Sequence, residues 1–282
     1  IASVLDDPVL KQFWNKEIAL LGKMQLSSAV APLTQRLGSF ITSKMSRHIL
    51  LQPESTISIS KIINEGKILL VNLSKGDIGE DHSFFFGAAL TSLIWMAAYQ
   101  RINIPEAKRK DFFLYVDEFQ NFATPRFSEI TSEGRKFRIG LIASHQNIAQ
   151  VDDKNILKII AGNANNLICL KASPDEEKFI LPFMEPEVSK GDIVNQPPYH
   201  FYMKVDNESS ENAFSGETIL PSVKHSQETM ESVVEASRTT YGKPRAEVEQ
   251  YLDNLLNNKQ VRREKRDYTD NSLFSTHRKK SI

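Results

Sequence analysis

The sequence has little cysteine and no long apolar run. Its one cysteine, Cys169, cannot form an intramolecular disulfide, and its place in a short apolar run favours a buried structural thiol in a reducing compartment. The longest apolar candidate, residues 84–98, is shorter than the ~20 residues that span a bilayer, and it contains Ser and Thr. These features argue against a disulfide scaffold and against a transmembrane helix in these residues.

The sequence also has no excess charge of one sign and no histidine pattern of a metal site. Thirty-five basic side chains balance thirty-five acidic ones, so the composition predicts no overall attraction to nucleic acid or anionic lipid. Any DNA contact would have to be local. No ligand spacing is evident among the histidines, which are His48, His82, His145, His200, His225 and His277.

The apolar periodicity predicts an α/β chain. Helical spacing predicts two helices within residues 8–50, a short helix ending at Gly66 and a long, mostly buried helix over residues 79–101. Apolar runs of strand length lie at residues 67–73, 112–116, 139–144, 166–171 and 199–205. Because strands alternate with helices, we expect a mostly parallel sheet covered by helices on both faces.

The composition changes near residue 222. Residues 1–222 have the apolar content of a folded core, whereas residues 223–282 are polar and charged. One amphipathic helix is predicted at residues 246–256, and a largely basic run lies at residues 262–266. We therefore predict a core of residues 1–222 and a partly helical or disordered tail of residues 223–282.

Two adjacent acids follow the second apolar run. Residues 112–116 lead directly into Asp117 and Glu118. At the carboxyl end of a strand, one carboxylate can face a Mg²⁺ ion and the next an attacking water. The same pattern also fits a strand that ends in two solvated charges, so this acid pair needs support from its surroundings.

Two further motifs follow the acid pair in order. Glu133-Gly134-Arg135-Lys136 ends a predicted helix, and the apolar run 139–144 leads into His145-Gln146. This succession resembles the ATPase core of the HerA/FtsK superfamily, and within it the coupling proteins of conjugation and type IV secretion. The resemblance covers residues 50–205, while the two ends of the chain match only in general character.

The resemblance implies a RecA-like P-loop NTPase core that binds ATP and Mg²⁺. By this resemblance, Asp117 orients the Mg²⁺ shell and Glu118 polarises the water that attacks the γ-phosphate. Gln146 would sense the γ-phosphate or align that water, although a polar strand cap is the alternative. Arg135 resembles an arginine finger that acts on a neighbouring subunit, although a solvated helix end is the alternative.

One part of that core is missing from the sequence. No Gly-x-x-x-x-Gly-Lys-[Ser/Thr] turn occurs, since Gly66-Lys67 is followed by Ile68 and lacks the earlier glycine. Either the chain begins after this Walker A turn, or it is a homologue that keeps only the fold. We expect the first, because residue 1 is Ile and the family places the turn before the acid pair. These residues alone are then not expected to hydrolyse ATP.

The resemblance further implies an ATP-driven DNA translocase in conjugation or type IV secretion. We expect a homo-oligomeric, hexameric ring that contacts DNA without sequence preference, with relaxase or secretion-channel proteins as partners. The expected location is the cytoplasm, at the cytoplasmic face of the inner membrane. Two alternatives stay open: a HerA-like cytoplasmic DNA-repair translocase, and a non-hydrolysing docking subunit with an ATPase-like fold.

Overall fold

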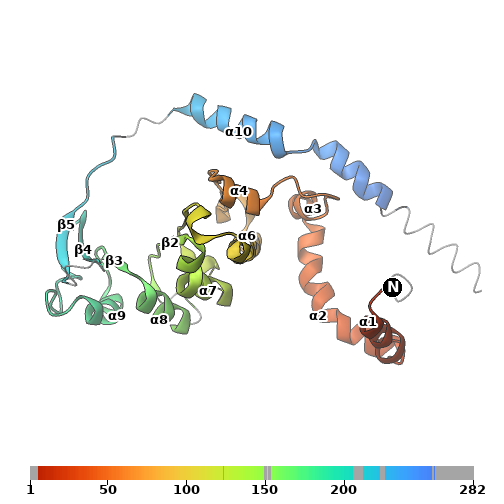
Figure 1. The fold of residues 1–282 in the computed structure, drawn as a ribbon, viewed down its shortest axis with the longest axis horizontal. Helices are drawn as coiled ribbons and strands as arrows, with labels where there is room; N and C mark the ends of the chain where they lie inside the picture. The colour runs from red at the N-terminus through yellow and green to blue at the C-terminus, as the bar shows by residue number, and fades with distance from the viewer. Residues whose placement is uncertain are drawn as a thin grey trace, which may run out of the picture. The chain divides into compact units, whose positions relative to one another are not determined.

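The computed structural model describes residues 6–122, 124–148, 151, 154–205, 212–222, 226–255 and 257. The chain divides into two compact units. Figure 1 labels the main helices and strands described below. One unit is Ile57–Gln227, and the other combines Ile1–Thr56 with Glu228–Ile282. The division predicted at residue 222 stays a prediction. The composition did not suggest that the two ends of the chain belong to one unit.

The described residues of the unit formed by the two ends are helices and the loops that join them. Its helices before residue 56 are α1 (Pro8–Gln12), the π-helix η1 (Phe13–Ile18), α2 (Lys23–Thr42) and α3 (Lys44–Leu50). Its later helices are α10 (Gln227–Tyr241) and residues 245–255. Val248 and Leu252 are buried, and His48 Nε2 lies 3.2 Å from Glu249 Oε1. Helical structure before residue 50 is confirmed, although the region holds four helical elements and not the two predicted. The helix predicted at residues 246–256 is confirmed up to residue 255, residue 256 lies outside the described residues, and α10 was not predicted.

The second unit begins with helices that pack around one long helix. They are α4 (Ile59–Glu65), α5 (Lys75–Ile78), α6 (Glu80–Tyr99) and the short 3-10 segments η2 (Gln100–Asn103) and η3 (Glu106–Lys108). Helix α4 ends at Gly66 in the left-handed conformation, with φ of 72°, as its sequence position predicts. Among the described residues, no helix is both long and apolar enough to cross a bilayer.

The α/β class is confirmed, with five strands in two sheets among the described residues. Strands β1 (Phe112–Val116) and β2 (Ile139–Ala143) pair in parallel. Between them lie the 3-10 segment η4 (Phe119–Phe122), helix α7 (Pro125–Glu133) and the 3-10 segment η5 (Gly134–Phe137). After β2 come α8 (Lys154–Asn163), β3 (Asn166–Cys169), α9 (Pro174–Met184), β4 (His200–Val205) and β5 (Phe214–Glu217).

The later strands differ from the predicted parallel order. Strands β3, β4 and β5 form a separate antiparallel sheet, in which Asn166 lies opposite Val205 and Cys169 lies opposite Tyr202. Alternation of strands and helices favours parallel pairing, but here the chain that leaves α9 enters β4 at the end where β3 finishes. The parallel part of the sheet is therefore β1 and β2.

The strand predicted at residues 67–73 is wrong. These residues form neither helix nor strand, and the side chains of Ile68 and Leu70 are 88% and 79% exposed. A strand needs a partner to take its backbone hydrogen bonds. Within the described part of the chain, no strand pairs with this segment. Its apolar composition therefore does not indicate burial in this unit.

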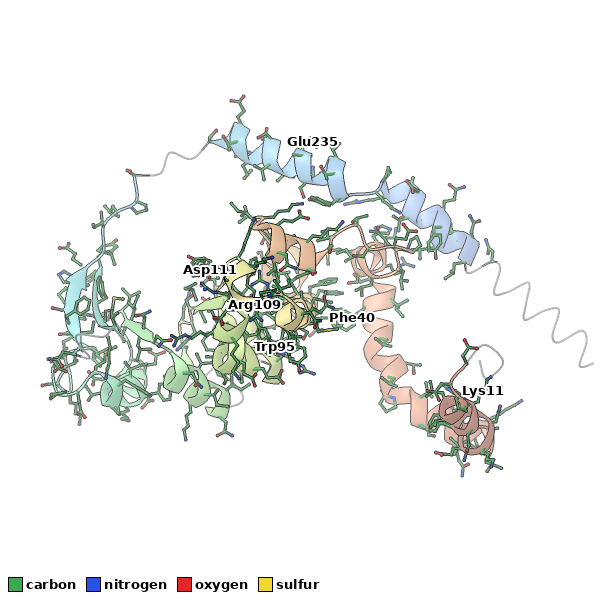
Figure 2. The ribbon with its side chains drawn as sticks, in the orientation of Figure 1. Lys11, Phe40, Trp95, Arg109, Asp111 and Glu235 are labelled. Atoms are coloured by element: carbon green, nitrogen blue, oxygen red, sulfur yellow. The ribbon has the colours of Figure 1, made fainter. Side chains whose placement is uncertain are left out.

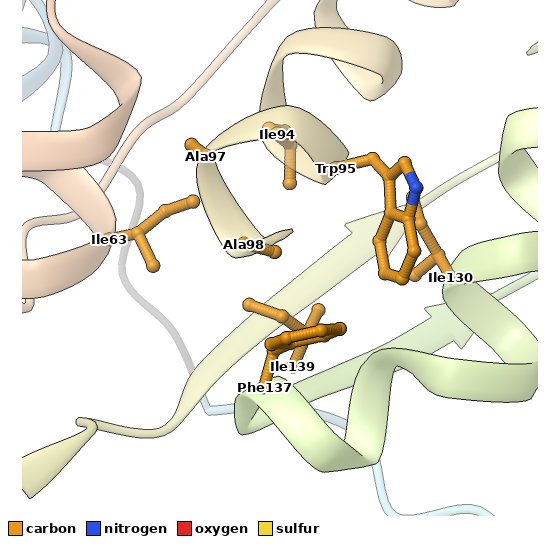
Figure 3. Close-up of a cluster of buried hydrophobic side chains, with 8 residues drawn as sticks. All are labelled: Ile63, Ile94, Trp95, Ala97, Ala98, Ile130, Phe137 and Ile139. Carbon is orange, nitrogen blue, oxygen red and sulfur yellow. The ribbon is translucent and has the colours of Figure 1, made fainter. Parts of the chain in front are cut away.

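The core beside β1 and β2 is built on α6. Figure 3 shows its buried members Ile63 from α4, Trp95 from α6, Phe137 from η5 and Ile139 from β2. The ring centroids of Trp95 and Phe137 lie 5.6 Å apart in an edge-on contact. A second cluster around Phe119, Phe127, Val151 and Leu157 lies under the residues that follow β1. Together these clusters fix the two ends of the parallel strand pair.

Candidate functional site

Asp117 is fixed between the two parallel strands where they end. Ser144 Oγ donates to Asp117 Oδ1 over 2.5 Å, and the Glu118 backbone N–H donates to the same oxygen over 3.0 Å. The ladder also continues past the strands, since Ser144 N donates to Val116 O and Phe119 N donates to Ser144 O, each over 3.0 Å. The exposed Asp117 carboxylate is thereby held in one orientation at the carboxyl ends of β1 and β2.

Glu118 has an uncommon backbone conformation and a fixed side chain. Its φ of 51° lies in the left-handed region, which few residues other than glycine adopt. This turn sends Phe119 inward, where its ring stacks on Phe127 with centroids 5.5 Å apart. Gln120 Nε2 donates to Glu118 Oε2 over 2.5 Å. The half-buried carboxylate therefore stays at the strand ends while the next residue enters the core.

His145 and Gln146 follow β2 at the same end of the strand pair. The His145 ring meets Phe119 edge-on, with centroids 5.3 Å apart. Burial lowers the pKa of His145, while the negative charges of Glu176 and Glu118 act in the opposite direction. Gln146 is exposed. The parallel topology therefore brings Asp117, Glu118 and Gln146 to one edge, which we call the carboxyl edge.

Arg135 lies at the opposite edge of the strand pair. It belongs to η5, which leads into the amino end of β2. A strand rises about 3.3 Å per residue, so the acid pair lies roughly 15 Å further along. Within the described residues the exposed Arg135 side chain makes no hydrogen bond or ion pair, whereas Lys136 contacts Glu133 and Arg138 contacts Asp111. One chain does not bring Arg135 together with its own acid pair.

The carboxyl edge has the donor chemistry of a Mg²⁺ site that is completed by a substrate. Asp117 Oδ1 accepts two hydrogen bonds, and within the described residues none reaches Oδ2. The described residues hold no group of three or more acidic, histidine or cysteine side chains that could enclose a metal. Mg²⁺ is commonly bound by one or two carboxylates together with water and phosphate oxygens. Asp117 fits this role.

A family comparison matches the segment that contains the carboxyl edge. Residues 111–180 match the family described as the TraM recognition site of TraD and TraG. The resemblance to coupling proteins is confirmed. The matched segment runs from the residue before β1 into α9, so it contains Asp117, Glu118, Arg135 and Gln146. No curated protein matches the chain.

The comparison with a solved coupling protein supports the RecA-like P-loop ATPase fold. The plasmid coupling protein TrwB, solved with ADP and Mg²⁺, matches with a TM-score of 0.55 and 16% identity. The match covers 73% of this chain and 52% of TrwB, so this chain spans about half of that protein. The genome packaging NTPase B204 of Sulfolobus turreted icosahedral virus 2, in complex with AMPPCP, matches with a TM-score of 0.42 and 19% identity over 60% of this chain and 74% of B204.

Two residues of the carboxyl edge were not predicted. Ser144 binds the first acid, and Gln120 binds the second. Ser144 ends the apolar run that we predicted as a strand, so its parallel pairing with the strand before Asp117 would have placed it beside that acid. No sequence pattern indicates the contact between Gln120 and Glu118, because this contact depends on the left-handed backbone at Glu118.

Proposed function

We propose that this chain is part of an ATP-hydrolysing coupling protein that moves DNA in conjugation or type IV secretion. The observation that carries the proposal is the carboxyl edge, where Asp117 and Glu118 are oriented by Ser144 and Gln120 inside the segment that matches the TraD and TraG family. Two oriented carboxylates beside the end of a parallel strand are the arrangement that phosphoryl transfer to water requires.

Each polar residue of the carboxyl edge has a distinct task in this proposal. Asp117 would hold Mg²⁺ through its free oxygen, and bound Mg²⁺ would offset the negative charge of the ATP phosphates. Glu118, held by Gln120, would accept a hydrogen bond from the attacking water and polarise it. Gln146 would align that water or contact the γ-phosphate, because an amide both donates and accepts.

Arg135 would complete the site of a neighbouring subunit. Its guanidinium is exposed, has no partner among the described residues and lies at the opposite edge from its own acid pair. A planar guanidinium matches phosphate oxygens and offsets the charge that develops during transfer. This arrangement requires an oligomer in which one subunit's Arg135 faces another's carboxyl edge, and we propose a hexameric ring.

The partners and the location follow from the same proposal. We propose that the ring contacts the DNA backbone through local charges, because the net charge of the sequence is zero. The matched family is described as the TraM recognition site of TraD and TraG, so residues 111–180 would also contact a protein similar to TraM. Relaxase and secretion-channel proteins are further proposed partners, at the cytoplasmic face of the inner membrane.

ATP hydrolysis by the complete product of the gene tests this function. We expect DNA to stimulate hydrolysis and Glu118→Gln to lower kcat by about 100-fold or more, with a smaller change in KM for ATP. Glu106→Gln is the matched control, because Glu106 is an exposed carboxylate in η3, away from the carboxyl edge.

Two outcomes would count against the proposal. If a well-folded complete protein does not hydrolyse ATP, the non-hydrolysing docking subunit is the better reading. If hydrolysis occurs but Glu118→Gln and Glu106→Gln behave alike, the carboxyl edge is not the site that activates water.

A further inference from the structure

Arg101 is a buried guanidinium whose donors reach three different residues. It is 0% exposed. Its Nη1 donates to Phe137 O over 2.7 Å, its Nη2 to Ile63 O over 3.0 Å and its Nε to Asn64 Oδ1 over 3.0 Å. Burial and the nearby Arg109 lower the pKa of Arg101, and Asp111 opposes this. A guanidinium stays charged under such conditions, so this contact joins α4 to the end of η5 through a buried cation.

Arg109 contacts the residue before Phe137 in the same turn. Its Nη1 donates to Lys136 O, and its Nε donates to Ile104 O over 2.8 Å. Its Cζ also lies 5.9 Å from the centroid of the Phe137 ring, in cation–π range. Figure 2 marks Arg109 and Asp111, and Figure 3 shows Phe137 packed in the core beside Trp95. Two arginines therefore bind two consecutive carbonyls.

These contacts hold the turn that carries Arg135, which we call the arginine turn (residues 134–138). The last carbonyls of a helical segment have no partner within it and need outside donors. Arg101 and Arg109 supply these donors. The turn also lies close against the start of β2, since a Cβ at Gly134 would be only 3.1 Å from Ile139 O. The backbone on both sides of Arg135 is thus fixed while its own side chain stays exposed.

We propose that Arg101 and Arg109 are positioning residues that aim Arg135 at the neighbouring subunit's nucleotide. The inference rests on the proposed function for the role of Arg135, but the fixed turn is a separate claim. A long side chain in contact with a phosphate is effective only if its base is held, because small misplacements lower rates strongly. Arg109 can be tested first, because it is half-buried and its removal perturbs the core less than removal of Arg101.

A nitroxide on Arg135→Cys in the complete protein measures the turn directly. Cys169 is buried and its pKa is raised to about 11, so it competes poorly for the label. We expect Arg109→Ala to increase label mobility at position 135. Arg126→Ala is the matched control, because Arg126 pairs with Glu129 on the surface of α7 and should leave the spectrum unchanged. Equal spectra for both variants would overturn the positioning claim.

Hydrolysis rates then connect the turn to Arg135. We expect Arg109→Ala to lower kcat by about tenfold or more in the otherwise unchanged protein, and to lower it no further in an Arg135→Ala background. If the kcat losses of the two single variants multiply in the double variant, Arg109 affects hydrolysis independently of Arg135. If Arg135→Ala keeps full activity while the label still responds to Arg109→Ala, Arg135 is not a finger, and only the claim that Arg109 fixes the arginine turn stands.

A second variant covers the case in which Arg109→Ala does not fold. Arg109→Lys keeps the positive charge and most of the stem over Phe137, but an ammonium cannot reproduce the planar fork that reaches Ile104 O and Lys136 O together. We expect Arg109→Lys to increase label mobility at position 135 as Arg109→Ala does. We also expect it to lower kcat no further in an Arg135→Ala background. A lysine variant identical to the parent in both measurements would contradict the proposal.

Discussion

At the scale of single residues, Glu118 shows how the site and the core share one turn. Its left-handed backbone costs about 1 kcal/mol relative to an ordinary conformation. The next residue, Phe119, is 2% exposed and packs on Phe127, so burial of its ring offsets that cost. The packing of Phe119 and the hydrogen bond from Gln120 therefore both contribute to the orientation of the Glu118 carboxylate.

Ser144 allows a test of the residue that holds Asp117. Ser144→Ala removes the hydroxyl that donates to Asp117 Oδ1. Residues behind a metal ligand orient it, and losing one weakens metal binding by about tenfold or more. We therefore expect the Mg²⁺ concentration that gives half-maximal hydrolysis by the complete protein to rise about tenfold. Ser132→Ala is the control, because that hydroxyl donates only within its own helix, to Ser128 O. An unchanged Mg²⁺ dependence would show that Ser144 has no such role.

At the scale of elements, the close approach of α6 to η4 is set by one glycine. A Cβ at Gly87 would lie 2.0 Å from Cδ1 of the Phe122 ring, which no native contact allows. Segment η4 begins one residue after Glu118, so the position of α6 also sets the start of this turn. A helix-interior glycine normally costs stability, and here it is required by packing.

Gly87→Ala is therefore expected to destabilise the protein, although alanine is the better helix former. Forced overpacking costs about 1–3 kcal/mol, and a 2.0 Å contact places this cost toward the upper end, above the gain of roughly 1 kcal/mol from helix propensity. Thermal unfolding would measure the change. Gly162→Ala in α8 is the matched control, because no atom lies within 4 Å of its added Cβ, and it should be neutral or stabilising. Equal effects of the two variants would contradict the packing argument.

The elements also show how far sequence patterns reach. Strands β1 and β2 were predicted to within one residue, because each apolar run has a parallel partner. Residues 67–73 have a similar composition but no ladder, and pairing cannot be read from composition. Helix α9 was missed although Ser173 and Glu176 form a capping box at its start, a signal that the sequence did carry.

The candidate site was predictable where topology alone decides it. Parallel pairing places Asp117, Glu118 and Gln146 at one edge, and the order of the motifs is visible in the sequence. The positioning arginines were not predictable, because Arg101 reaches Phe137 and Ile63 across more than thirty residues in either direction. Buried cations that bind backbone carbonyls leave no periodic pattern in a sequence.

At the scale of the whole molecule, the opposite placement of Arg135 and the acid pair makes the proposed ring depend on contacts between subunits. Each nucleotide would contact Glu118 of one subunit and Arg135 of the next, so hydrolysis depends on neighbours. A monomer with both residues intact would then hydrolyse slowly even with ATP bound. This dependence distinguishes a finger acting between subunits from a cation that only stabilises its own helix end.

Mixing two inactive variants tests this dependence. In an assembly made only of Glu118→Gln subunits every site lacks the water-activating carboxylate, and in one made only of Arg135→Ala subunits every site lacks the guanidinium. In a 1:1 mixture, roughly a quarter of the interfaces join an intact Glu118 to an intact Arg135, because each is contributed independently. We therefore expect the mixture, after subunit exchange, to recover up to about a quarter of the unmodified rate.

If both residues acted within one chain, no mixed interface would be complete and the mixture would stay inactive. The same measurement with Lys136→Ala in place of Arg135→Ala is the control, because Lys136 is paired with Glu133 and that variant should be active on its own.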